Sequence, residues 1–243
     1  MSNVLILSAH CDDAPLCLGG SLLGGLFKIK PKVIIVFPIS RYIIKNDTDL
    51  SEVEITRIRN KEERVAAELA NYEVVFLGFK EVFSRYDYSD LEMVFKLLPV
   101  KEDPIYEEVK KKLLEIVIDH DGIICSPLAI GNHKDHRLIL QVMKEFLKLN
   151  SNMPVLFYED LPYSDYTKNL VKPDFLVEID ENLILKPFLF SDFDMEQKVK
   201  LIKVYQSQID ERQVKQVIHY WKSIGKGERI WLTKSAHKLL FEE

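Results

Sequence analysis

The sequence is short of cysteine and of long hydrophobic runs, and each shortage excludes a class of protein. Only three cysteines occur among 243 residues, an odd and scattered set that does not fit a disulfide framework. The longest stretch without a charged residue runs from Ala14 to Phe27, which is shorter than the about 20 apolar residues that a membrane-spanning helix needs. The sequence therefore predicts a chain without disulfide bonds and without an integral membrane segment.

An excess of positive charge is also lacking. The 33 lysines and arginines are outnumbered by 38 aspartates and glutamates, which gives a net charge of −5 at pH 7. Because nucleic-acid binding needs a basic surface that neutralises phosphates, we expect no nucleic-acid partner. The first apolar run, Val4–Leu7, has no positively charged segment before it and does not resemble a signal peptide. Free thiols and the lack of a signal peptide together predict a cytoplasmic protein.

What the sequence does contain is an ordinary globular composition, with 47% hydrophobic and 29% charged residues. Short apolar runs with little internal alternation predict strands that are buried on both faces, as in a parallel sheet covered by helices. Four such runs are Val4–Ser8, Val33–Phe37, Val74–Leu77 and Gly122–Cys125, and two further candidates are Pro154–Tyr158 and Phe175–Ile179.

Helical patterns lie between these runs and after them. Apolar residues recur at helical spacing over Ser51–Ala70, Ile105–His120, Asp135–Leu149, Asp192–Ile209 and Gln213–Ser223. The alternation predicts an α/β fold, with a Rossmann-like, doubly wound, mostly parallel sheet and helices on both faces. We expect a single domain, in which residues 1–160 form the core and residues 161–243 form a C-terminal extension packed on it. Residues 83–103 are an irregular insertion of the kind that often lines a site.

Two groups of histidines and aspartates stand directly after predicted strands. The first strand is followed by His10, Asp12 and Asp13, and the fourth by His133, Asp135 and His136. No phosphate-binding glycine fingerprint accompanies the first group, so nucleotide binding is not favoured. If the first and fourth strands are neighbours, both groups meet at the topological switch point of the sheet. Two imidazole nitrogens and one carboxylate oxygen with an open position make a catalytic metal site.

At these residues the sequence resembles the LmbE-like (PIG-L) family of metal-dependent N-deacetylases. That family has A-H-P-D-D-E after its first strand, a Gly-Gly pair, and a later H-x-D-H motif. The matching segments here are Ala9-His10-Cys11-Asp12-Asp13-Ala14, Gly19-Gly20 and His133-Lys134-Asp135-His136, with less specific matches at Arg59-Asn60-Lys61-Glu62, Phe157-Tyr158-Glu159 and Tyr205-Gln206-Ser207-Gln208. Two positions depart from the pattern, because Cys11 stands in place of proline and Ala14 in place of glutamate.

The resemblance implies removal of an N-acetyl group from an N-acetylglucosamine-type amino-sugar conjugate by a metal-bound water. It implies His10, Asp13 and His136 as the metal ligands, with Zn²⁺ as the favoured metal and Fe²⁺ as the alternative. Neither departure falls on one of these positions. Ala14 does replace a polar neighbour of the site, which leaves metal affinity and substrate placement open.

The resemblance also implies roles for the remaining residues. Asp12 would be the general base, and His133 would stabilise the oxyanion or donate a proton. Asp135 would orient His133, and Arg59 would bind sugar hydroxyls. These roles agree with the chemistry of amide hydrolysis, because a zinc-type ion lowers the pKa of bound water from ~15.7 towards ~7 and polarises the carbonyl.

Two other functions compete with this interpretation. A degenerate family member that binds a sugar or a metal without turnover is one alternative, and Ala14 is the feature in its favour. A non-haem Fe(II) oxygenase is the other, because His10, Asp12 and a distant His136 have the bare pattern of its metal ligands. Those oxygenases are all-β proteins, which the alternating pattern opposes. The sequence leaves open the aglycone and whether the chain forms a homo-oligomer.

Overall fold

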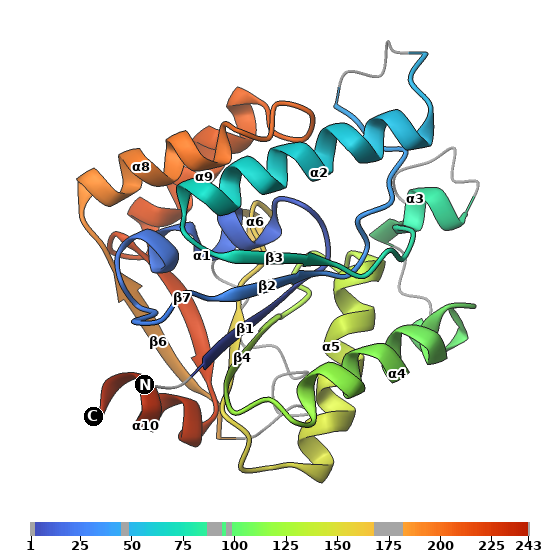
Figure 1. Cartoon of the computed structure of the whole chain (residues 1–243). Coiled ribbons are helices and arrows are strands. Elements are labelled where there is room, and N and C mark those ends of the chain that lie inside the picture. The colour runs from blue at the N-terminus through green and yellow to red at the C-terminus, as the bar shows by residue number, and fades with distance from the viewer. Residues whose placement is uncertain (1–2, 45–48, 87–93, 96–98, 168–181, 243) are drawn as a thin grey trace.

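One mixed sheet runs through the molecule and carries helices on both faces (Figure 1). The computed structural model describes residues 3–44, 49–86, 94–95, 99–167 and 182–242. Within them the strands are β1 (Asn3–Ser8), β2 (Lys32–Ile35), β3 (Glu73–Phe76), β4 (Gly122–Pro127), β5 (Val155–Tyr158), β6 (Ile184–Leu189) and β7 (Gly227–Leu232). Their order across the sheet is β3-β2-β1-β4-β5-β7-β6. Strands β1 to β5 pair in parallel, whereas β7 runs antiparallel to both β5 and β6.

The helices form two layers, one on each face of the sheet. In the described part of the chain they are α1 (Asp13–Leu23), α2 (Glu52–Leu69), α3 (Val82–Arg85), the 3-10 turn η2 (Val100–Glu102), α4 (Tyr106–Val117), α5 (Lys134–Leu149), α6 (Tyr163–Thr167), α8 (Asp192–Ile202), α9 (Glu211–Ser223) and α10 (Lys234–Phe241). Helices α1, α2, α8 and α9 cover one face, and α4 and α5 cover the other (Figure 1).

Strand β1 explains why a continuous apolar run predicts a central strand. Val4 and Ile6 pack into the core on the side of α1, α2, α8 and α9, whereas Leu5 and Leu7 pack into the core on the side of α4 and α5. Successive side chains of a strand point to opposite faces, so a strand covered on both faces needs apolar residues at every position. The α/β fold and its doubly wound sheet are therefore confirmed.

The individual elements agree with the sequence prediction except in the last third. Helix α2 begins with the capping box that Ser51 and Glu54 predict. Helix α8 ends at Ile202, earlier than the expected Ile209. The chain turns there, so that the Tyr205 hydroxyl donates to Glu63 at 2.7 Å and the backbone N–H of Ser207 donates to Glu62 at 3.0 Å. The candidate strand at residues 175–179 lies outside the described residues.

The C-terminal extension holds α1 through a buried acidic side chain. Glu228 on β7 accepts hydrogen bonds from the backbone N–H groups of Gly20 and Ser21, at 2.7 and 2.8 Å. It also accepts one at 2.6 Å from Lys198 on α8, whose side chain is buried. A Cβ atom at Gly19 would lie 3.0 Å from the Lys198 side chain. The glycine pair therefore allows α1 and the extension to approach closely.

No helix in the described segments is both long enough and apolar enough to cross a bilayer.

Candidate active site

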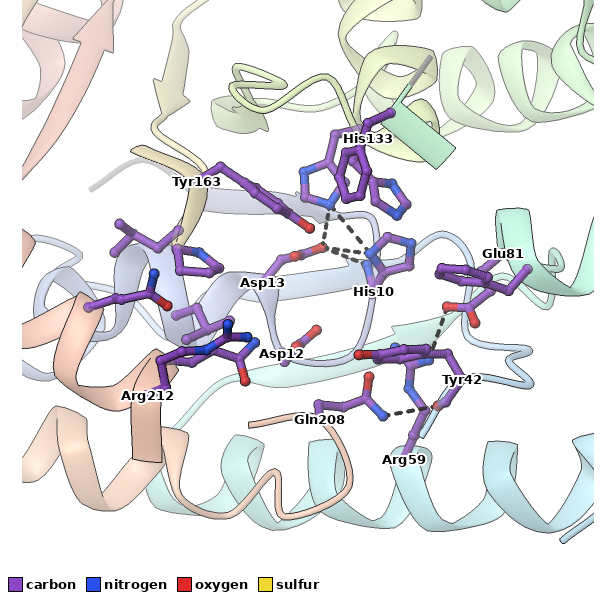
Figure 2. A pocket seen from close by; sticks show the side chains of 18 residues that line it. His10, Asp12, Asp13, Tyr42, Arg59, Glu81, His133, Tyr163, Gln208 and Arg212 are labelled. Carbon is purple, nitrogen blue, oxygen red and sulfur yellow. Dashed lines mark hydrogen bonds and ion pairs between the residues drawn. The ribbon is translucent and has the colours of Figure 1, made fainter. Parts of the chain in front are cut away.

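The two histidine-aspartate groups meet at the carboxyl end of the sheet. Strands β1 and β4 are parallel neighbours, so the segments that follow them leave the same edge. His10 lies in the turn after β1, and Asp13 is the first residue of α1. His133 caps the N-terminus of α5, and His136 lies in its first turn. Figure 2 shows the side chains of His10, Asp13 and His133 pointing toward one another in a pocket that His136 also lines.

Three donor atoms form a nearly equilateral triangle. Oδ2 of Asp13 lies 3.5 Å from Nδ1 of His10 and 3.4 Å from Nε2 of His136, and these two nitrogens are 3.4 Å apart. All three side chains are buried. In a tetrahedral site with metal–ligand distances of about 2.1 Å, neighbouring donors lie about 3.4 Å apart. The triangle therefore has the dimensions of a divalent cation site with an open fourth position.

Carboxylates behind the triangle fix the tautomers of both histidines. Oδ2 of Asp135 contacts Nε2 of His10 at 2.9 Å, and Oδ1 of Asp160 contacts Nδ1 of His136 at 2.5 Å. An ionised carboxylate only accepts hydrogen bonds, so the ring nitrogen that faces it carries the proton. In the neutral ring, which is the form that binds a metal, the other nitrogen then directs its lone pair into the triangle. This carboxylate–histidine arrangement is typical of metal ligands.

The charges around the triangle shift its pKa values in a consistent way. Burial lowers the pKa of His136, but Asp13 and Asp160 outweigh it and hold that pKa well above its ordinary value. Burial raises the pKa of Asp13, but His136 and His10 outweigh it and lower that pKa. The backbone N–H of His10 also donates to Oδ2 of Asp13 at 2.7 Å. Asp13 is therefore ionised and held in place between the two histidines.

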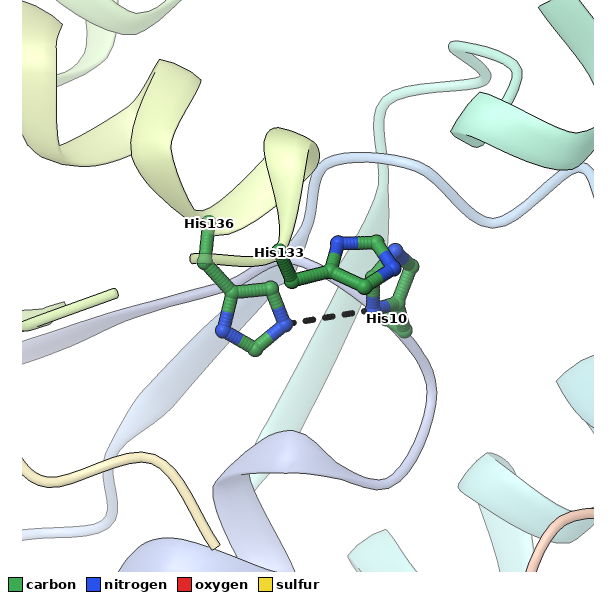
Figure 3. A group of neighbouring side chains, drawn as sticks. All are labelled: His10, His133 and His136. Carbon is green, nitrogen blue, oxygen red and sulfur yellow. Dashed lines mark hydrogen bonds between the residues drawn. The ribbon is translucent and has the colours of Figure 1, made fainter. Parts of the chain in front are cut away.

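His133 stands beside the triangle and differs from the other two histidines. Figure 3 shows it against His10 and His136, and one nitrogen from each of the three rings lies within 4.8 Å of the others. Nδ1 of His133 accepts a hydrogen bond from the backbone N–H of Asp135 at 3.3 Å, so its proton is on Nε2. Burial and the charge of His10 lower the pKa of His133 well below its ordinary value. His133 is thus a neutral hydrogen-bond donor. The ligand atoms of His10, Asp13 and His136 lie closer together than the nitrogens of the three histidines, so Asp13 and not His133 completes the triangle.

Asp12 lines the pocket beside the triangle and has its carboxylate available. Although it is the N-cap residue of α1, its side chain makes no capping hydrogen bond. Burial and the negative charge of Asp13 raise the pKa of Asp12 to about 8. A carboxylate with a raised pKa that is not committed to the helix is suited to accept a proton from a neighbouring water.

The role of Asp135 in orienting His133 stays a prediction, and the structure directs the Asp135 carboxylate to other partners. The Asp135 carboxylate contacts His10, the backbone N–H of Val82 at 2.9 Å and the guanidinium of Arg85 at 2.7 Å. Only the backbone N–H of Asp135 reaches His133. The physical reason is the helix cap: in the first turn of α5 the backbone N–H groups point toward the capping side chain, and the Asp135 side chain points away from it.

Arg59 lies in the pocket wall, but its side chain is only 3% exposed. Its Nη1 donates to Glu81 at 3.0 Å and to the hydroxyl of Ser40. Its Nε has no hydrogen-bond partner among the described residues. The structure therefore brings Arg59 to the predicted pocket, with part of its guanidinium already held in an ion pair.

The pocket is a cavity of about 280 Å³ with both polar and aromatic walls. Beyond the predicted residues it is lined by Leu16, Tyr42, Glu81, Phe83, Phe95, Leu161, Pro162, Tyr163, Gln208, Arg212, Gln213 and Gln216. Tyr42 and Phe83 stack with ring centroids 5.3 Å apart. The wall residues come from loops, from single positions of α1, α3 and α6, and from α9, and they form no local sequence motif. Asp160 was missed although it follows β5, whose carboxyl end lies at the same edge of the sheet.

Comparison with known proteins identifies the fold. No family model matches the sequence, and neither does any curated protein. A deacetylase of teicoplanin biosynthesis is 20% identical, with 95% of this chain and 97% of that chain covered and a TM-score of 0.74. A teicoplanin deacetylase structure has also been solved in a zinc-inhibited form, with 21% identity, coverage of 95% and 97%, and a TM-score of 0.72.

Two further structures show how widely this fold is used. The N,N'-diacetylchitobiose deacetylase from Pyrococcus horikoshii is 20% identical, with 97% of this chain and 85% of that chain covered and a TM-score of 0.61. The 4-carboxy-2-hydroxymuconate hydratase from Pseudomonas putida is 15% identical, with coverage of 96% and 95% and a TM-score of 0.53. Because one fold serves both deacetylases and a hydratase, the reaction has to be argued from the site.

Proposed function

We propose that this protein is a metal-dependent hydrolase that removes the N-acetyl group from an N-acetylglucosamine-type amino-sugar conjugate. The observation that carries the proposal is the triangle of donor atoms from His10, Asp13 and His136, with Asp12 and His133 beside it. The deacetylases that share this fold are consistent with it. The alternative of a non-haem Fe(II) oxygenase, which would be an all-β protein, disagrees with the mostly parallel sheet covered by helices.

The donor set suits Zn²⁺, and Fe²⁺ is the alternative. Two imidazole nitrogens and one carboxylate oxygen with an open position are typical of catalytic zinc, and the same facial set also binds non-haem Fe²⁺. Such an ion, when bound, would lower the pKa of a coordinated water and polarise the carbonyl of the acetamide. The residues of this chain then have to move the protons and hold the substrate.

Asp12 is the general base in this proposal. Asp12 immediately precedes the ligand Asp13 in the chain, and it lines the same pocket. A divalent cation bound beside Asp12 would favour its ionised form, and Asp12 would then accept the proton of the attacking water. Because Asp13 is held by His10 and His136, the two adjacent aspartates divide the work, one as a ligand and one as a base. Such proton transfer is typically worth about 10²–10⁴ in rate.

His133 stabilises the oxyanion in this proposal. Its neutral ring has the proton on Nε2, because Nδ1 accepts from the backbone N–H of Asp135. A donor held by a helix N-terminus is oriented before the substrate arrives, so it does not have to reorganise as the negative charge develops. The amino-sugar itself would lie against the polar and aromatic wall, where Arg59 and Tyr163 face the cavity.

A non-catalytic protein that binds a metal or a sugar is the second candidate. The observation in its favour is Ala14, which is fully buried in the hydrophobic core where the resembling family has a glutamate. The two candidates differ in acetate release and agree in metal binding, so both properties have to be measured on the same preparation.

The test measures acetate release from a panel of N-acetylated amino-sugar conjugates. The wild-type protein is assayed after chelation and after reloading with Zn²⁺ or Fe²⁺, and Asp12→Asn is assayed beside it. We expect activity that depends on the metal and falls by about 10²–10⁴ in Asp12→Asn, with metal affinity retained. Full activity after exhaustive chelation would contradict the proposal, and metal binding without acetate release from any conjugate would favour the second candidate.

A further inference from the structure

A buried series of alternating charges leads from the insertion to the metal site. It begins at Asp103, continues through Arg85 at the end of α3, and reaches His10 through Asp135. The side chains of Asp103 and Asp135 are 0% exposed and that of Arg85 is 4% exposed. Burying a full charge is costly unless the charge has a partner. These side chains are therefore held in fixed ion pairs, unlike charged side chains on a solvated surface.

Arg85 is fixed on several sides. One terminal nitrogen, Nη2, donates to Asp135 at 2.7 Å and to Asp103 at 3.0 Å, and the other, Nη1, donates to the backbone oxygen of Lys80 at 2.6 Å. The guanidinium also lies over the ring of Phe37, 5.2 Å from its centroid. The planar guanidinium can make these contacts together, whereas a lysine ammonium is a single point charge and cannot cover the same set.

The two oxygens of Asp135 have different partners. Oδ1 accepts from Arg85, whereas Oδ2 accepts from the backbone N–H of Val82 and contacts Nε2 of His10. A carboxylate is planar, so the contact of Arg85 with Oδ1 and that of Val82 with Oδ2 together fix its plane and the direction of the lone pairs on Oδ2. The orientation of the His10 ring, and with it the direction in which Nδ1 points, therefore depends on the contact with Arg85.

We infer that Arg85 is a positioning residue that acts through Asp135 to hold His10 in its metal-binding tautomer and orientation. The inference rests on the proposed function only in taking the triangle of His10, Asp13 and His136 as the metal site. The inference gives the insertion a role other than lining the pocket, because Arg85 at the end of α3 holds Asp135 in place. Partners one shell beyond the ligands typically contribute 10–100-fold to metal affinity.

The experiment measures the dissociation constant for Zn²⁺ alone by competition with a chromophoric chelator. Arg85→Met removes the guanidinium and keeps much of the side-chain volume, whereas Arg85→Lys keeps the charge. Arg229→Met is the matched control, because Arg229 donates to the buried Glu159 at 2.8 Å, and Glu159 contacts Tyr220 and Trp231 and no residue of the triangle. Thermal unfolding of the metal-free proteins reports the stability lost in each.

We expect the dissociation constant to rise about 10–100-fold in Arg85→Met, to rise less in Arg85→Lys, and to stay within about twofold of wild type in Arg229→Met. If Arg85→Met does not fold, Asp103→Asn tests the same series, with a smaller rise expected because Arg85 keeps its contact with Asp135. An affinity in Arg85→Met equal to that of Arg229→Met would overturn the inference, as would a wild-type protein that binds no Zn²⁺. Wild-type protein that binds Zn²⁺ but releases no acetate would refute the deacetylase and leave the role of Arg85 standing.

Discussion

Replacing Asp160 with asparagine should weaken metal binding without creating a cavity, because the two side chains have nearly the same shape. In the wild-type protein Oδ1 of Asp160 contacts Nδ1 of His136 at 2.5 Å, and Oδ2 accepts from the backbone N–H of Ile130 at 2.9 Å. Asparagine has one oxygen for these two N–H groups. If that oxygen stays with Ile130, the amide NH₂ faces Nδ1, and the imidazole proton has to move to Nε2. Nε2 of His136 is the atom that faces Asp13 in the triangle, so the lone pair that would hold the metal is lost.

The size of the effect follows from the cost of restoring that lone pair. Restoring the metal-binding tautomer leaves one buried N–H opposite another, which costs about 1–3 kcal/mol. At about 1.4 kcal/mol for each factor of ten, the dissociation constant for Zn²⁺ should rise by roughly 10–100-fold. Titration against a chromophoric chelator measures it. The control is Asp165→Asn, because Asp165 contacts the exposed His219 at 2.6 Å and does not line the pocket. Equal Zn²⁺ affinity in the two variants would refute the tautomer argument.

Two further predictions concern the hydrogen-bond donor and the pH dependence. His133→Ala should lower kcat by about 10²–10³ with little change in the dissociation constant for Zn²⁺, because it removes the donor to the oxyanion; a parallel loss of metal would instead make His133 a ligand. Burial raises the pKa of Glu63 to about 7 even though Tyr72 and Tyr205 donate to it. Since the folded pKa lies above the unfolded value of about 4.3, stability should fall by about 3 kcal/mol as the pH rises from about 4.5 through 7. Glu63→Gln should remove most of this fall in urea unfolding measured at pH 5 and pH 8, and an unchanged pH dependence would contradict it.

Much of the architecture could be predicted because it depends on local pattern. Continuous apolar runs such as Val4–Ser8 indicate strands covered on both faces, and strand ends in a parallel sheet share one edge. The convergence of the histidine-aspartate groups after β1 and β4 follows from those two rules once the strands are neighbours, as they are. The early end of α8 at Ile202 could not be predicted, because contacts with α2, a segment distant in sequence, stop the helix.

The partners of the candidate site residues were harder to predict than the residues themselves. Asp135 lies two positions from His133 in sequence, which suggests a pair, but its side chain points to His10 instead. Arg85 could not be told apart from a solvated surface charge, because its burial depends on Asp103, which lies 18 residues later at the end of the same insertion. Asp160 had the same positional signal as the other site residues, an acidic group directly after a parallel strand, and could have been found by applying that rule to β5.

The close approach of α1 to the C-terminal extension makes the two parts of the chain inseparable. The helix that starts with Asp13 has two of its backbone N–H groups tied to Glu228, near the far end of the sequence. A protein cut back to its first 160 residues would keep every residue of the donor triangle and Asp12, yet it would lose the side chain that secures that helix. Such a fragment would contain the residues of the site without the contacts that align them. Variants in which the last third is shortened or replaced should therefore retain Glu228 and Lys198.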